Sequence, residues 1–152
     1  MKLTKKRAIE EHRKMWNWIA EQYENETDIL LELHDIDRLK DYYIQLHLNE
    51  LSDLKMAGNC FCCAYDRLYN GDCSHCPLNW GNNDWDVACM RMGDEAGLFE
   101  TIDILTHEKS SKEALEFCGK IARKIANLPD ADSHLFRSME PYYPATLCHG
   151  GH

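Results

Sequence analysis

The sequence contains no long hydrophobic segment. Charged side chains interrupt every apolar stretch well before it reaches the roughly 18 residues that a membrane-spanning helix requires. The N-terminal stretch is basic, but Arg13 and Lys14 interrupt the residues after it, so the apolar region of a secretory signal is missing. We therefore expect no membrane partner and a cytoplasmic location, where disulfides are rare.

The sequence also lacks the short motifs that mark common catalytic sites. It has no glycine-rich phosphate loop, no Gly-x-Ser-x-Gly turn and no His-Glu-x-x-His helix. Because no catalytic constellation stands out at a recognisable spacing, we expect a protein that is not an enzyme.

Basic residues are scarce, with 17 Lys and Arg against 26 Asp and Glu, for a net charge of −9. A net acidic chain is a poor candidate for binding the phosphates of nucleic acid. Residues 2–14 nevertheless form a basic patch, which leaves nucleic-acid binding as the alternative function.

The acidic residues are concentrated in one segment. Residues 21–53 carry ten acidic and only two basic side chains. Such a surface speeds the encounter with a basic patch on another protein and selects partners. The candidate partner-binding residues are Glu32, Asp35, Asp41 and Glu50.

Apolar residues recur at three- and four-residue spacing, which predicts a mainly α-helical protein. The helical stretches are residues 5–24, 29–56, 95–107 and about 111–127. Thr4 is placed to cap the first helix. Ser110 and Glu113 together predict a capping box at the start of the last helix. In the second stretch, a slip in spacing after Leu46 permits a kink or a division into two helices.

Six of the eight cysteines fall between Cys60 and Cys89. Cys60 and Cys63 form one Cys-x2-Cys pair, and Cys73 and Cys76 form another. Two such turns can direct four thiolates at one ion, and a closed set of four sulfurs is typical of structural Zn²⁺. We therefore predict that Cys60, Cys63, Cys73 and Cys76 bind zinc.

Two alternatives stay open for this metal site. Cys89 could replace Cys60 or Cys73 as a ligand, and an iron–sulfur cluster needs the same four sulfurs as zinc. A metal is expected in either case, because about 35 irregular residues cost tens of kcal/mol to order. Structural zinc contributes about 10–16 kcal/mol toward that cost.

The expected architecture is a single helical domain of 152 residues with an irregular cysteine-rich zinc module inserted between helices. Its parts are N-terminal helices at 1–57, the zinc module at 58–94, C-terminal helices at 95–128 and an irregular tail at 129–152.

Four short stretches resemble a family of small, uncharacterised, cysteine-rich bacteriophage proteins. They are HRKMWNWIA at 12–20, NCFCC at 59–63, CSHCPLNW at 73–80 and IANLP at 125–129. The resemblance implies a phage origin, hence the host cytoplasm, and a zinc-binding fold, but no established activity. We expect an accessory protein that binds a host or phage protein, for example to inhibit a host machine or defence system.

Overall fold

The computed structural model describes most of the helical part of the chain. The described residues are 3–33, 35–54, 56, 60–69, 76–78, 91–92, 95–96, 98–107 and 111–130. Within them the protein is mainly α-helical, as the apolar spacing predicted, with seven helices and one pair of two-residue strands. The helices are α1 (Lys5–Asn25), α2 (Asp28–Leu33), α3 (Ile36–Leu46), α4 (Leu48–Leu51), α5 (Phe61–Asp66), α6 (Leu98–His107) and α7 (Lys112–Ala126).

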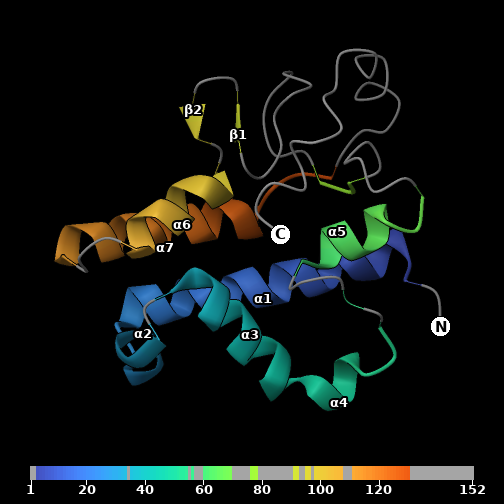
Figure 1. Ribbon diagram of the computed structural model, residues 1–152, viewed down its shortest axis with the longest axis horizontal. Coiled ribbons are helices and arrows are strands. Elements are labelled where there is room, and N and C mark those ends of the chain that lie inside the picture. Colours follow the sequence, from blue (N-terminus) through green and yellow to red (C-terminus); the bar gives the residue numbers. More distant parts are fainter. Residues whose placement is uncertain are drawn as a thin grey trace.

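Helix α1 is the central element of the fold. Thr4 caps it as predicted, because its side chain accepts a hydrogen bond from the backbone N–H of Arg7 at 3.1 Å. Helix α7 packs along α1, α6 packs on α7, and α5 lies beside the N-terminal part of α1 (Figure 1). Helix α3 contacts both α1 and α6, so the segments before and after the cysteine region share one core.

The predicted division of residues 29–56 after Leu46 is confirmed, but the prediction of at most two helices was wrong, because a further break precedes α3. The stretch forms three helices, α2, α3 and α4, which are separated at Asp35 and at His47. The carboxylate of Asp35 accepts the backbone N–H of Asp37 at 2.8 Å and so starts a new helix. At the other break, Nδ1 of His47 donates to the backbone oxygen of Tyr43 at 3.0 Å, where α3 ends.

Two further boundaries differ from the prediction by a few residues. The N-cap of α7 is Ser111 rather than Ser110, since the Ser111 hydroxyl accepts the N–H of Ala114 at 3.1 Å. Helix α6 begins at Leu98, after the strand β2 (Glu95–Ala96), which pairs antiparallel with β1 (Arg91–Met92). The apolar spacing located both helices, but it does not determine which polar residue caps them.

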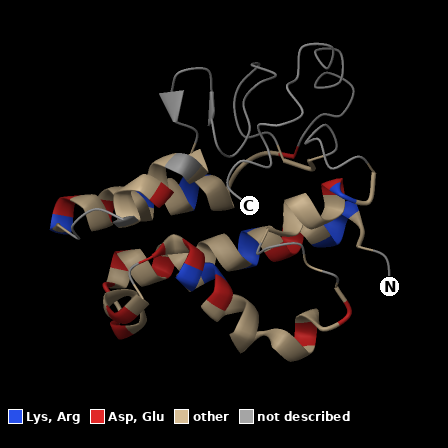
Figure 2. Cartoon of the chain, viewed as in Figure 1, with Lys and Arg blue, Asp and Glu red and all other residues tan. Residues whose placement is uncertain are grey.

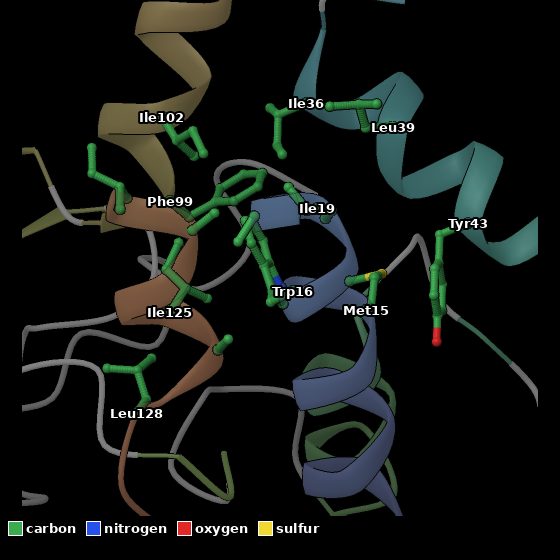
Figure 3. Packing of buried hydrophobic residues seen from close by; sticks show 14 of the residues in the cluster. Met15, Trp16, Ile19, Ile36, Leu39, Tyr43, Phe99, Ile102, Ile125 and Leu128 are labelled. Carbon is green, nitrogen blue, oxygen red and sulfur yellow. The ribbon is translucent and has the colours of Figure 1, made fainter. Parts of the chain in front are cut away.

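The core is built from side chains of α1, α3, α6 and α7, which meet around Trp16 and Phe99 (Figure 3). Trp16 is 2% exposed, as its place on the apolar face of α1 predicted. Its ring meets Phe99 edge to face, with the centroids 6.2 Å apart. Cys118 of α7 is buried as well, and it packs as a small apolar core residue.

Candidate metal centre and acidic face

The first Cys-x2-Cys pair lies at the start of α5. Cys60 is the N-cap of this helix, and its sulfur accepts the backbone N–H of Cys63 at 3.2 Å. The Cys63 side chain also hydrogen bonds to this sulfur and is the main reason why the pKa of Cys60 is lowered to about 6. Burial opposes this shift, while the Lys40 ammonium and nearby backbone N–H groups add to it. Cys60 is therefore prepared to act as a thiolate ligand.

Cys62 and Cys76 form a second pair of thiols beside the first. Cys62 is 1% exposed, and its side chain hydrogen bonds to Cys76. Burial first, and the neighbouring thiols second, raise the pKa of Cys62 well above its usual value. Cys62 thus favours the protonated form, which agrees with its omission from the predicted ligands.

His12 of α1 connects this thiol cluster to α7. Its Nε2 lies 3.0 Å from the backbone oxygen of Ile125, and its Nδ1 lies 3.8 Å from Sγ of Cys62. A carbonyl oxygen can only accept, so Nε2 carries the proton of the neutral ring. Burial is the main reason why the pKa of His12 is lowered to about 4. His12 lies on the buried face of α1, and nothing in the sequence indicated its thiol neighbour.

The donor chemistry of the described cysteines fits a zinc ion. Cys60, Cys63 and Cys76 all belong to the predicted ligand set, and all three interact electrostatically with Cys62. The remaining predicted ligand, Cys73, and its alternative, Cys89, lie outside the described residues. No three thiols in the described part have sulfurs within 4.8 Å of one another, so this part alone does not form a closed tetrahedral site.

A buried ammonium lies close to this cluster. Lys40 of α3 is 4% exposed, and its Nζ stands 4.5 Å from the ring centroid of Phe99. The charge is thus held over an aromatic face in the core, where its field reaches both Cys60 and His12. Such a cation would offset part of the negative charge that four thiolates bring to a Zn²⁺ ion.

Three of the four candidate partner-binding residues lie at the surface. Glu32 of α2, Asp41 of α3 and Glu50 of α4 are exposed. The fourth, Asp35, is half-buried and caps α3, so it has a structural role as well. Figure 2 shows Asp or Glu positions on all three helices. The four residues follow one another along three successive helices rather than along one long helix.

The structure brings together three carboxylates that the sequence did not connect. Oxygens of Asp35, Asp37 and Asp103 lie within 4.8 Å of one another, where α3 begins beside α6. These residues are 68 positions apart in the sequence at their widest, so their proximity depends on the packing of the two helices. The cluster adds negative charge at one end of the acidic segment.

Large apolar side chains are exposed on the same three helices. They are Leu31, Tyr42, Leu46 and Leu48, each between 37% and 53% exposed. We call these four residues, together with Glu32, Asp41 and Glu50 on the same three helices, the acidic face. Large apolar side chains exposed alongside charged ones are a feature of surfaces that bind other proteins.

Three cations of the predicted basic patch at the N-terminus have carboxylate partners. Arg7 forms two bonds to the Asp53 carboxylate, at 2.6 and 3.1 Å, and these bonds lower the pKa of Asp53. Arg13 contacts Asp130 at 2.9 Å, and Lys14 contacts Glu11 at 3.4 Å. This pairing weighs against the nucleic-acid alternative, because these cations already have carboxylate partners.

Comparison with protein-family models, curated proteins and solved structures found no match. Within the described residues, no helix is both long enough and apolar enough to cross a membrane. The function is therefore inferred from the geometry of the site.

Proposed function

We propose that the protein acts by binding another protein through the acidic face of α2, α3 and α4. The observation that carries this proposal is the coincidence of exposed carboxylates and exposed large apolar side chains on the same short helices. Apolar contacts supply affinity when they are buried, and carboxylates select a basic partner and speed its approach. On the resemblance to phage proteins, the partner would belong to the infected host or to the phage.

We also propose that the cysteine segment is held by one structural Zn²⁺, bound by Cys60, Cys63, Cys73 and Cys76. The support within the described residues is the N-cap position of Cys60, with Cys63 one turn later and Cys76 beside Cys62. The ion would supply folding free energy rather than chemistry. It would tie the start of α5, which packs on α1, to the segment around Cys76.

The proposed function is tested by the rate of association with a partner captured on the immobilised protein. The quadruple variant Glu32→Gln, Asp35→Asn, Asp41→Asn and Glu50→Gln should associate about ten-fold more slowly at low salt and depend less on salt. Asn at position 35 retains the cap of α3, so folding should change little.

The control neutralises two exposed carboxylates on α7, in the double variant Glu113→Gln and Glu116→Gln. The control should bind like the wild type. An unchanged association rate for the quadruple variant at low salt would contradict a docking role for the acidic face.

A further inference from the structure

An aromatic platform lies beside the acidic residues, where α1 meets α3. The rings of Trp18 and Tyr42 are nearly parallel, with an angle of 13° and centroids 6.2 Å apart. Trp18 also contacts Tyr43 at 5.5 Å, and Tyr43 stacks on His47 at 4.1 Å. Tyr42 is 37% exposed, so one end of this platform reaches solvent.

Acidic residues outnumber basic ones near the platform. Asp41 is exposed next to Tyr42, and the carboxylates of Glu11 and Glu50 lie close enough to Tyr43 to act on its hydroxyl. Arg38 is the one exposed base on α2, α3 and α4 within the described residues, against five exposed carboxylates there: Asp28, Glu32, Asp37, Asp41 and Glu50. An aromatic ring with carboxylates around it favours a cation over its face.

We propose that this platform receives an arginine side chain from a basic segment of the partner protein. The proposal rests on the proposed function and specifies which chemistry the acidic face selects. A guanidinium is planar, so it can stack on Tyr42 while its N–H groups donate to the neighbouring carboxylates. A lysine ammonium is more strongly hydrated and cannot stack in this way.

The core of the same protein contains a related contact, between a lysine cation and two aromatic rings. The Lys40 ammonium lies over Phe99 and also faces Trp16, 6.0 Å from its ring centroid. There the chain supplies its own cation to an aromatic pair in the interior. At Tyr42 an aromatic ring is partly exposed to solvent, and exposed carboxylates outnumber Arg38, the one exposed base on the described parts of α2, α3 and α4.

The test compares the binding of two synthetic peptides, deca-arginine and deca-lysine, to the full chain at the same ionic strength. The wild type should prefer deca-arginine. Tyr42→Leu keeps apolar area but removes the ring, and it should lower the affinity for deca-arginine about two- to five-fold, with little change for deca-lysine. Tyr42→Phe retains the ring and should keep the preference.

Phe117→Leu is the matched control, because Phe117 is an exposed aromatic residue on α7. It should leave both affinities unchanged. An arginine preference that is the same in wild type and Tyr42→Leu would overturn the inference but leave the proposed function intact. If the quadruple charge variant bound each peptide as tightly as the wild type does, that result would instead contradict the proposed function.

Discussion

His12 and Ile125 are joined across the core, because Nε2 of the imidazole donates to the backbone oxygen at 3.0 Å. These residues are 113 positions apart and lie on α1 and α7, which pack along each other. The same ring presents Nδ1 to Cys62 of α5. One neutral histidine therefore links the helical core to the cysteine cluster.

This link predicts a loss of stability in mild acid. The pKa of His12 is about 4 in the folded protein, against an ordinary value of 6.5 in an unfolded chain, so between these values only the unfolded chain binds the proton. Stability from this group is complete above pH 6.5 and falls as the pH drops toward 4. We expect His12 to account for about 2 kcal/mol of lost unfolding free energy between about pH 7 and pH 5.

Urea unfolding at both pH values checks this prediction. His12→Gln removes the titrating group. The unfolding free energy that this variant loses between about pH 7 and pH 5 should therefore be smaller than the wild-type loss by about 2 kcal/mol. His47→Gln, which replaces a histidine at the end of α3, should behave like the wild type. Equal losses in wild type and His12→Gln would show that the buried imidazole is not responsible.

The apolar face of α7 gives a second prediction. Ile121 is 7% exposed, and an aspartate at this position would bury an unpaired charge at a cost of several kcal/mol. Ile121→Asp should therefore lose native near-UV circular dichroism. Lys120→Asp places an aspartate at the exposed neighbouring position and should remain folded. If the two variants melted at the same temperature, the assignment of this face to the core would be wrong.

The proposed zinc site gives a third prediction. Native mass spectrometry should find one zinc ion per chain, and Cys63→Ser should lose it together with several kcal/mol of stability. Cys118→Ala changes a buried thiol on α7 and should keep the metal. A wild-type protein that is fully folded without metal would contradict the zinc proposal, and bound iron would favour the iron–sulfur alternative.

Local signals in the sequence were sufficient to predict most of the helices. The apolar spacing of Ile9, Trp16 and Ile19 predicted the buried face of α1, and Thr4 predicted its start. The break at Asp35 was missed because Leu33, Ile36 and Leu39 continue the three-residue spacing across it. The spacing of apolar residues indicates which side of a helix faces the core. The start of α3 instead depends on one short side chain, that of Asp35.

Fewer contacts of the candidate site could be predicted from the sequence, because these contacts join distant positions. Cys spacing predicted that Cys60 and Cys63 lie together, but nothing local connected His12 to Cys62, which is 50 residues away. Composition identified the acidic segment. The stacking of Trp18 on Tyr42 depends on how α1 packs against α3, and a single sequence does not encode that contact in any short pattern.

The central claim is that the acidic face is where the protein binds its partner, and site-specific photo-crosslinking tests it most directly. A benzophenone amino acid is placed at Leu46 in one variant and at Phe117 in another, which are 53% and 51% exposed. In bacterial cells that contain the partner, we expect a discrete crosslinked protein from position 46 and none from position 117. The same product from both positions, or a product from position 117 alone, would contradict that claim.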